Sequence, residues 1–436
     1  MNSTDVIIIG SGAAGLMAAY TLVKEGKAVT VLEARNRMGG RIHTISNGSF
    51  SAHTELGAEF IHGNLPLTLN LLKEAGITKS RVSFEMWQHH NGTFNQSNEF
   101  VEGWDAFLEK LNRLEHDMPI QDFLSQNFAG EAYTKMRTQI ENYAAGYDTA
   151  DVCDAGAFAL RNEWNHEDED AQYRITGGYL ALINYLADAC TNAGNTILLN
   201  NAATQIHLEN DAVTVHTANG LTYKANQVIV ALPLGVLQAP KNTKGAIQFY
   251  PPLHEYEAAI NNIGFGSVIK ILLEFDIVFW ESDAITKLAG ANLSTMGFLF
   301  SDEEIPTFWT QAPAHRPLLT GWLGGPPAHK QKDMQPEAIM QMALTSLSNI
   351  FKMKPNALKD KLTAWEVANW TAEPYTRGSY AYDKVKSTQA RNILLQPVKN
   401  AIYFAGEYLY NGPAIGTVEA ALTSGKNAAE MVLKGK

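Results

Sequence analysis

Three glycines near the start of the chain form a turn whose spacing can hold a phosphate group. Gly10, Gly12 and Gly15 follow a short β-branched run in the order Gly-x-Gly-x-x-Gly. The first glycine permits a tight turn, the second lets the backbone approach a pyrophosphate, and the third lets the following helix pack on the strand. Unpaired N–H groups at the helix start, around Ala13 and Ala14, favour the anion.

An acidic residue follows at the distance that such a nucleotide site requires. Glu33 ends the second expected strand, about 20 residues beyond the glycines, where a carboxylate hydrogen-bonds the ribose hydroxyls. The same charge repels a 2′-phosphate and so disfavours NADP. A glycine turn alone is a weak signal, because structural turns also use glycine. Strand, turn, helix and acid together predict a dinucleotide site.

The segment after Glu33 bears on which dinucleotide is bound. Residues 35–41 combine cations with the flexible pair Gly39-Gly40, where a second phosphate contact is expected, although a solvated basic loop would have the same composition. Arg37-Met38-Gly39-Gly40-Arg41 resembles the Arg-x-Gly-Gly-Arg motif of flavin-containing amine oxidases. That family includes monoamine oxidases, polyamine oxidases and lysine-specific histone demethylases. The resemblance implies FAD rather than NAD.

The resemblance continues in order along the chain, which makes it more specific than any one motif. Similar stretches are Leu56–Gly63, whose His-Gly ending is nearest to polyamine oxidases, Arg174–Gly178, Val228–Leu237, Gly264–Lys270, Pro374–Tyr380 and Phe404–Glu407. The FAD-binding residues expected from pattern and resemblance are Gly10, Gly12, Ala13, Ala14, Gly15, Glu33, Ala34, Arg35, Gly39, Gly40, Arg41, Gly57, Ala58, Glu59, Phe60, Ala203, Gly406, Glu407, Thr417 and Val418.

Three residues are the candidates for catalysis. Lys270 lies in the apolar run Val268–Leu273, where a lysine by itself would be expected to snorkel to a sheet edge. The resemblance implies instead that Lys270 holds a water near flavin N5. His62 is equally compatible with a structural histidine and with an imidazole that positions a substrate amine. Tyr380 matches one tyrosine of the family's aromatic cage.

The chain also departs from the family pattern. Ser379 occupies the place where monoamine oxidases have a flavin-bonded cysteine, which implies non-covalent FAD. The second cage tyrosine falls near Pro413, which counts against a complete cage and a monoamine oxidase specificity. The helical tower of histone demethylases is missing, which disfavours a nucleosome substrate. Residues 57–63 contain no arginine to clamp a carboxylate, which counts against an amino acid oxidase.

These residues need a scaffold of α/β type. A βαβ opening is expected at 5–9, 13–24 and 28–32, a mostly helical stretch at 101–193, strands at 196–199, 204–208, 213–217, 227–231 and 401–405, and a last helix from Thr417. The positive end of that last helix can stabilise charge on a reduced flavin ring. The predicted fold is a discontinuous Rossmann-type FAD-binding domain (1–78, 196–267 and 381–436) with an inserted α+β substrate domain (79–195 and 268–380).

Composition limits the remaining possibilities. The 436 residues suit two domains, and 45% hydrophobic with 18% charged residues is typical of a soluble globular protein. A net charge of −11 without a basic run disfavours nucleic acid, and two cysteines form neither a disulfide framework nor a metal site. Because no apolar stretch reaches the ~20 residues of a membrane helix, we expect no membrane anchor and a cytoplasmic location.

The sequence therefore predicts FAD-dependent oxidation of a polyamine or monoamine. A neutral amine would lose hydride to flavin N5, the imine would hydrolyse, and molecular oxygen would return the flavin with release of hydrogen peroxide. The alternatives are another flavin oxidoreductase of this fold, of amino acid oxidase or desaturase type, and a non-catalytic FAD-bound scaffold. The amine, the oxidised bond, the electron acceptor and the oligomeric state stay open.

Overall fold

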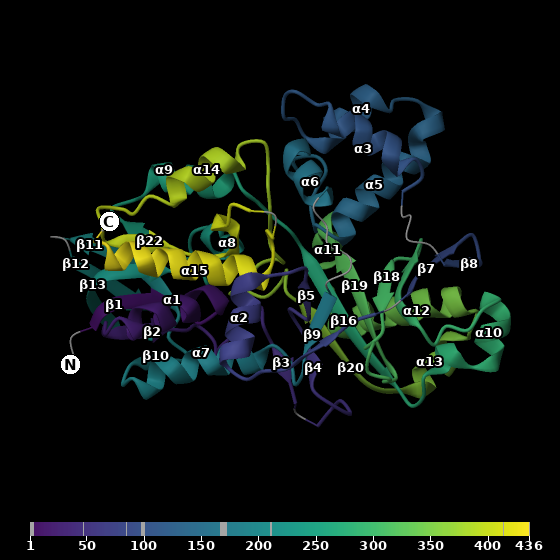
Figure 1. The fold of residues 1–436 in the computed structure, drawn as a ribbon, viewed down its shortest axis with the longest axis horizontal. Coiled ribbons are helices and arrows are strands. Elements are labelled where there is room, and N and C mark those ends of the chain that lie inside the picture. Colours follow the sequence, from purple (N-terminus) through teal and green to yellow (C-terminus); the bar gives the residue numbers. More distant parts are fainter. Residues whose placement is uncertain are drawn as a thin grey trace.

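The computed structural model describes residues 4–46, 48–83, 85–96, 101–165, 172–209, 212–412 and 414–435. Two large sheets occupy the two ends of an elongated molecule, and a group of short helices stands beside the second sheet (Figure 1). The first sheet contains β1 (Thr4–Ile9), β2 (Val29–Leu32), β10 (Thr196–Leu198), β11 (Ala203–Glu209), β12 (Ala212–Thr217), β13 (Thr222–Val230), β14 (Gln248–Tyr250) and β22 (Ile402–Phe404).

The first sheet has a parallel centre, in the order β10-β2-β1-β13, with β22 also parallel to β13. Side chains of β1 alternate between its two faces, as the period of a strand requires. Val6 and Ile8 share a core cluster with α1 (Ala13–Lys24) and α15 (Val418–Leu433), and Ile7 and Ile9 share another with α9 (His254–Asn261) and α14 (Ser387–Leu394). Both faces are thus covered, which explains the unbroken apolar run of β1. The helix α7 (Leu180–Asn192) packs beside α1.

The second sheet is mostly antiparallel. Its strands, in order, are β20 (Leu362–Asn369), β16 (Val268–Phe275), β19 (Leu318–Gly324), β18 (Thr307–Trp309), β17 (Met296–Ser301), β7 (Glu85–His90) and β8 (Thr93–Gln96). In this order, β16 lies between β19 and the edge strand β20. Ile269, Ile271 and Leu273 point to one face, against α12 (Pro336–Phe351). Alternation therefore turns Lys270 toward the opposite face, which looks at the first half of the molecule.

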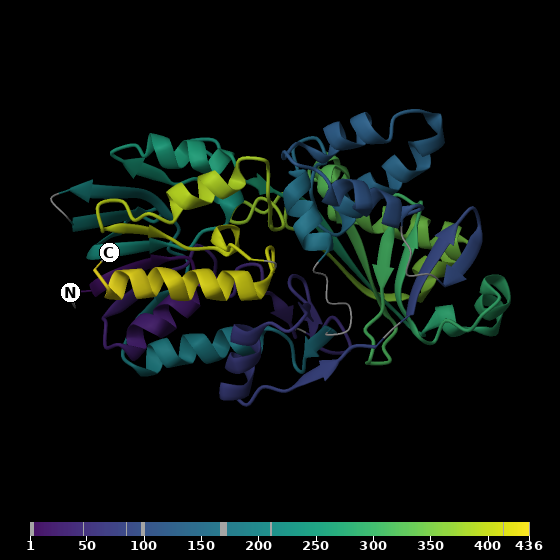
Figure 2. The ribbon, with the colours of Figure 1, turned by 45° about the horizontal axis from the view of Figure 1, so that its top comes forward.

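Smaller elements fill the space between and beside the sheets. The helical lobe consists of α3 (Trp104–Asn112), α4 (Ile120–Asn127), η1 (Glu131–Tyr133), α5 (Thr134–Gly146) and α6 (Ala157–Trp164), and it lies over the second sheet (Figure 2). A three-stranded sheet joins β5 (Phe60–His62), β9 (Gln172–Ile175) and β6 (Lys79–Arg81). The others are β3 (Thr44–Ile45), β4 (Thr54–Glu55), α2 (Pro66–Glu74), α8 (Leu234–Leu237), β15 (Gly264–Phe265), η2 (Phe279–Glu281), α10 (Asp283–Ala289), α11 (Gly325–Gln331), α13 (Pro355–Lys361), β21 (Ala381–Tyr382) and η3 (Glu407–Leu409).

The predicted fold class is confirmed: a Rossmann-type βαβ unit opens a mixed α/β chain that returns to the first sheet at β22 and α15. The domain boundaries stay a prediction. One helix departs from them, because α7, which they count with the second domain, packs against α1. None of the helices in the described ranges has the length and apolar character needed to cross a membrane.

Candidate functional site

A large cavity of ≈ 1330 Å³ extends between the first sheet, the second sheet and the helical lobe. Every residue that the sequence assigned to FAD binding or catalysis lines this cavity, with the exception of Gly15. A Cβ at Gly15 would lie 1.9 Å from the Gly10 carbonyl oxygen, so this glycine serves the close contact of α1 with the preceding turn. The other two glycines of the turn, Gly10 and Gly12, line the cavity and can face a ligand.

The start of α1 has the features of a phosphate cradle. Gly10 has a φ of +104°, and a Cβ there would lie 2.6 Å from the Ala231 oxygen. Gly12 caps α1 without any side-chain hydrogen bond, and the atoms nearest to a Cβ at Gly12 are 3.9 Å or more away. The first N–H groups of α1 therefore meet open cavity next to Ala13 and Ala14. This cradle fits the pyrophosphate of a dinucleotide.

The carboxylate of Glu33 is fixed at the end of β2. Its Oε2 accepts from the backbone nitrogen and the hydroxyl of Ser11, at 2.9 and 2.8 Å, and its Oε1 accepts from the Arg35 nitrogen at 2.9 Å. The side chain is buried but lines the cavity. Sequence reasoning missed Ser11, although its position inside the glycine turn was the available signal. Oε1 receives only one of these three hydrogen bonds and so keeps acceptor capacity for a ribose hydroxyl.

The basic segment after β2 is held by the protein itself. Arg41 donates to Glu407 Oε1 at 2.9 Å and to the Ser379 carbonyl at 2.5 Å, which joins the segment to the C-terminal part of the chain. Arg37 donates to the Gly40 and Ile42 carbonyls at 3.0 and 3.2 Å, and it does not line the cavity. Burial, followed by the charge of nearby Arg35, lowers the pKa of Arg37 to about 10. Arg37 therefore stabilises the conformation of the loop through these hydrogen bonds.

Lys270 is not the isolated lysine of an apolar strand that the sequence suggested. Its Nζ lies 2.6 Å from Glu59 Oε2, 3.1 Å from the Gly57 carbonyl oxygen and 5.4 Å from the centre of the Trp309 ring. The other carboxylate oxygen of Glu59 lies 2.8 Å from Arg174. Burial would raise the pKa of Glu59, but Lys270 and Arg174 lower it below its usual range. The sequence missed this partner because Glu59 and Lys270 are far apart along the chain.

His62, at the end of β5, lines the cavity close to Phe60. Its Nδ1 donates to Gln172 Oε1 at 2.6 Å, which leaves Nε2 as the acceptor. Desolvation lowers the pKa of His62 more than Gln172 and Glu59 raise it, which favours the neutral imidazole. The structure thus brings His62 to the cavity with a hydrogen bond on one ring nitrogen.

Tyr380 lies on the wall that the cavity shares with the helical lobe, and its hydroxyl donates to the Tyr147 carbonyl. Burial, with the charges of Asp148 and Glu163, raises the pKa of Tyr380. Ser379, beside it, has its hydroxyl 2.6 Å from the Thr149 hydroxyl. Pro413 lies outside the described residues.

The outer part of the cavity contains two sets of residues that sequence reasoning did not single out. Carboxylates line it at Asp302, Glu303 and Glu304, and Asp302 pairs with His90. Aromatic side chains come from both the helical lobe and the second sheet: Trp104, Tyr143, Tyr147, Trp164, Phe298, Phe300, Trp309 and Trp322. The sequence signal was helical spacing, since Tyr143 on α5 stacks with Tyr147, four residues later and directly after the end of the helix.

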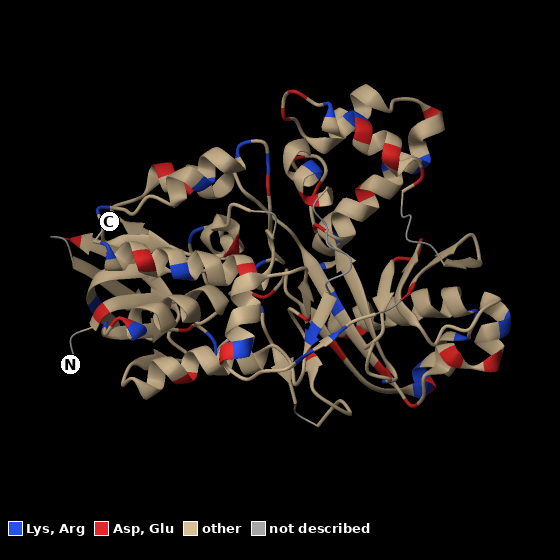
Figure 3. Ribbon diagram, viewed as in Figure 1, with Lys and Arg blue, Asp and Glu red and all other residues tan. Residues whose placement is uncertain are grey.

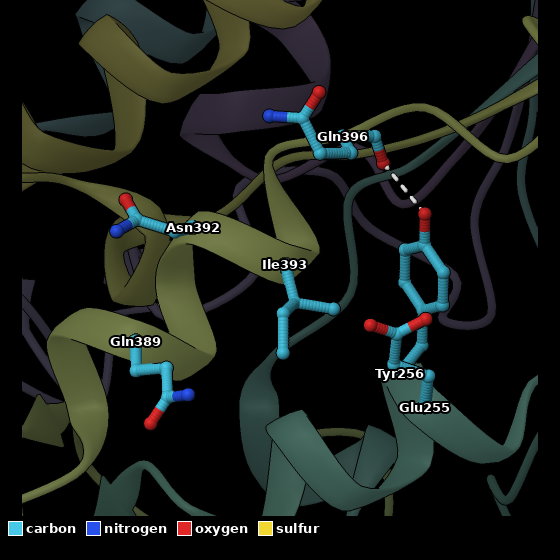
Figure 4. Close-up of a pocket in the computed structure, with 6 residues that line it drawn as sticks. All are labelled: Glu255, Tyr256, Gln389, Asn392, Ile393 and Gln396. Atoms are coloured by element: carbon cyan, nitrogen blue, oxygen red, sulfur yellow. Dashed lines mark hydrogen bonds between the residues drawn. The ribbon is translucent and has the colours of Figure 1, made fainter.

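Outside this cavity, the distribution of charged residues and the second cavity provide fewer groups that could take part in a reaction. Lys and Arg positions are interspersed with Asp and Glu positions over both halves of the molecule (Figure 3). A second cavity of ≈ 420 Å³ lies between α9 and α14, where Tyr256 donates to the Gln396 carbonyl at 3.0 Å (Figure 4). Its walls contain none of the predicted site residues. Within the described ranges, no group of three or more His, Cys, Asp or Glu side chains is arranged to hold a metal ion.

Comparison with known proteins agrees with a nucleotide cofactor in this cavity. The sequence model of the family described as flavin containing amine oxidoreductase matches residues 13–433. The chain is 30% identical over 458 residues to polyamine oxidase 2 of Arabidopsis thaliana, covering 98% of this chain and 88% of that protein. It is 28% identical over 454 residues to lysine-specific histone demethylase 2 of Homo sapiens, covering 93% of this chain and 50% of that protein.

Solved structures share the fold. Putrescine oxidase with bound putrescine superimposes with a TM-score of 0.79 at 20% identity, covering 99% of each chain. Cyclohexylamine oxidase from Brevibacterium oxydans IH-35A gives a TM-score of 0.78 at 19% identity, again with 99% of each chain covered. The fold and the site define a flavoprotein oxidoreductase. The chain belongs to the flavin-containing amine oxidoreductase family and is an enzyme that oxidises amines, so the predicted family, enzyme class and flavin cofactor are confirmed.

Proposed function

We propose that this enzyme oxidises elongated amines with more than one nitrogen, of the di- and polyamine type, and uses molecular oxygen as the final electron acceptor. The observation that carries the proposal is the lining of one cavity. Its walls include Gly12 and Glu33, Lys270, and the carboxylates of Asp302, Glu303 and Glu304. One continuous space therefore contains a cofactor cradle, a buried lysine and a group of carboxylates.

The residues present fit FAD along the inner part of this cavity. The start of α1 would hold the pyrophosphate and Glu33 the ribose, while Glu407 and the start of α15 would hold the flavin end. Bound FAD would supply the acceptor for the hydride of the amine. Because Ser379 has a hydroxyl in place of a thiol, we propose that the cofactor is held without a covalent bond to the chain.

The charges along the cavity favour a substrate whose two ends differ in protonation. An amine that gives up a hydride must be neutral, and neutral His62 can accept a hydrogen bond from its N–H. The cation of Lys270 disfavours a second positive charge at the same end. Asp302, Glu303 and Glu304 favour an ammonium group at the other end. A diamine or polyamine satisfies both conditions at once.

The walls of the inner cavity also exclude water from the reacting carbon. Phe60 and Trp309 lie on this wall, with ring centres 6.1 Å apart, and both line the cavity next to Lys270. In the absence of bulk water the hydrogen bonds of Lys270 and His62 gain strength. Relatives named polyamine oxidase and the fold relative that binds putrescine support the same substrate class.

The proposal is tested by peroxide release from purified FAD-loaded enzyme. The panel contains diamines, polyamines, monoamines of equal chain length and amino acids, each at several concentrations. We expect kcat/KM for di- and polyamines to exceed that of the matched monoamine by about tenfold or more, because one charge-assisted hydrogen bond contributes about 1.5–3 kcal/mol. Turnover of amino acids alone would favour an amino acid oxidase. Flavin that no amine reduces would favour a scaffold.

A further inference from the structure

Both oxygens of the Glu59 carboxylate are engaged by protein groups. Oε2 accepts from Lys270 Nζ at 2.6 Å and from Trp309 Nε1 at 3.2 Å. Oε1 accepts from Gln311 Nε2 at 3.4 Å and forms an ion pair with Arg174 at 2.8 Å. Two oxygens with about four lone-pair sites thus face four polar groups of the protein. Glu59 is therefore committed to protein partners, although it lies at the cavity.

The same contacts decide what Lys270 can do. An ammonium has three N–H donors, and Glu59 and the Gly57 carbonyl take two of them. Among the described residues, no protein acceptor is found for the third. Because Lys270 lines the cavity and is otherwise buried, the third donor can reach a molecule inside the cavity. Its direction is set by the two acceptors already engaged.

Three separate parts of the chain meet at this cluster. Glu59 comes directly before β5, Arg174 lies on β9 and Lys270 lies on β16. In the β5–β9 ladder, Phe60 pairs with Arg174, so the neighbour of Glu59 fixes where the guanidinium approaches. Arg174 in turn donates to the Thr310 carbonyl at 2.9 Å, on the loop after β18. The position of the Glu59 carboxylate is therefore determined from several sides, independently of Lys270.

We propose that Glu59 is a positioning residue for the oxidation reaction. It holds the ammonium of Lys270 as a fixed hydrogen-bond donor toward the reacting end of the cavity, and it prevents the lysine from acting as a base. This inference rests on the proposed function, in which Lys270 acts on the substrate side of the flavin. It assigns to Glu59 a role distinct from the FAD contact expected from the sequence.

The test is a double-mutant cycle of Glu59→Gln and Lys270→Met in the FAD-loaded enzyme. Anaerobic stopped-flow mixing with the best amine gives the rate of flavin reduction, and mixing reduced enzyme with oxygen gives the rate of reoxidation. We expect Glu59→Gln to slow whichever half-reaction Lys270→Met slows, by about tenfold to a hundredfold, because a charged hydrogen-bond partner is lost. The double variant should be no slower than Lys270→Met alone, since Glu59 acts through the lysine.

Glu274→Gln is the matched control. Glu274 is also a buried glutamate in an ion pair, with Arg316 at 2.9 Å, but it does not line the cavity. Its loss should lower stability and leave both half-reaction rates unchanged. If Glu59→Gln does not fold, Glu59→Asp keeps the charge and withdraws the carboxylate by one methylene. We expect Glu59→Asp to retain FAD and to slow the same half-reaction.

The outcomes separate this inference from the proposed function. Wild-type rates in a folded Glu59→Gln or Glu59→Asp enzyme would overturn the positioning role. So would independent effects that multiply in the double variant, because they would make Glu59 a structural residue. If no amine reduces the wild-type flavin, the proposed function itself is wrong.

Discussion

Lys270 Nζ and Glu59 Oε2 lie 2.6 Å apart although the two residues are separated by 211 positions in the chain. The pair forms where the face of β16 that points away from α12 meets the segment leading into β5. A buried ammonium without a partner would cost several kcal/mol, and the carboxylate offsets this cost. The pairing turns Lys270 into a group with one defined direction of donation into the cavity.

Replacing Lys270 with methionine should affect the stability of the fold as well as the rates of the flavin half-reactions. The variant leaves the Glu59 carboxylate buried with one cation fewer, and breaking a buried pair from one side typically costs about 3–5 kcal/mol. We expect slower flavin reduction, slower reoxidation or both, together with a lower free energy of unfolding in urea. The double variant with Glu59→Gln should regain part of that stability. A Lys270→Met enzyme with wild-type rates and full FAD content would make Lys270 a structural residue.

Loss of the Glu33 carboxylate should weaken FAD binding. A hydrogen bond to a charged group contributes about 1.5–3 kcal/mol, so Glu33→Ala should raise the Kd of FAD roughly tenfold to a hundredfold. Because Glu33 also accepts from the Ser11 hydroxyl, Ser11→Ala should cause a smaller loss. Fluorescence titration of the apoprotein measures both. The control is Glu25→Ala, because Glu25 is exposed. An unchanged Kd for Glu33→Ala would show that Glu33 does not bind the ribose.

Substitution of two glycines of the same turn by alanine should have different effects. A Cβ at Gly12 meets no atom closer than 3.9 Å, so Gly12→Ala should fold with near-normal stability but obstruct the pyrophosphate and lose FAD affinity. A Cβ at Gly15 would lie 1.9 Å from the Gly10 oxygen, so Gly15→Ala should destabilise the fold itself. Urea unfolding of the apoproteins and FAD titration separate the two effects. Equal loss of stability in both variants would contradict this division.

The flavin should be released intact when the protein is denatured. Ser379, whose hydroxyl meets Thr149, has no thiol to form a thioether with the cofactor. Acid or heat should therefore leave a yellow supernatant whose chromatogram matches authentic FAD. Flavin that remains with the precipitated polypeptide would show a covalent link through another residue.

Glu55 should make stability depend on pH near neutrality. Burial raises the pKa of Glu55 to about 7, although the Tyr179 nitrogen and the Thr44 hydroxyl lower it. The unfolded chain releases this proton near the ordinary value of 4.5, so the folded state binds more protons between these values. Its contribution to stability is complete below 4.5 and is lost as the pH rises through about 7.

The expected size of this loss is about 2–3 kcal/mol between pH 5 and pH 8, from about 1.4 kcal/mol per pKa unit. Urea unfolding of the wild type and of Glu55→Gln at several pH values measures it as the difference between the two curves. Glutamine does not titrate, so the variant should lack this component. Parallel curves would mean that Glu55 stays ionised throughout this range.

Much of the nucleotide half could be predicted because its signals are local. The spacing of Gly10, Gly12 and Gly15 and the position of Glu33 depend only on one strand, one turn and one helix that are consecutive in the chain. The short apolar run around Lys270 likewise predicted a strand. The periods of strands and helices determine such elements from their own residues, without reference to the remainder of the fold.

The substrate side was decided by the tertiary structure. No local pattern states that Glu59 and Arg174 meet Lys270, or that Tyr147 of the helical lobe accepts from Tyr380, because each contact joins segments brought together only when the two sheets and the lobe assemble. The sequence could therefore determine the cofactor class and the identity of the lysine. Packing between distant segments decides which charge faces that lysine and where its free donor points. It also decides which carboxylates line the cavity. Sequence spacing does not encode such packing.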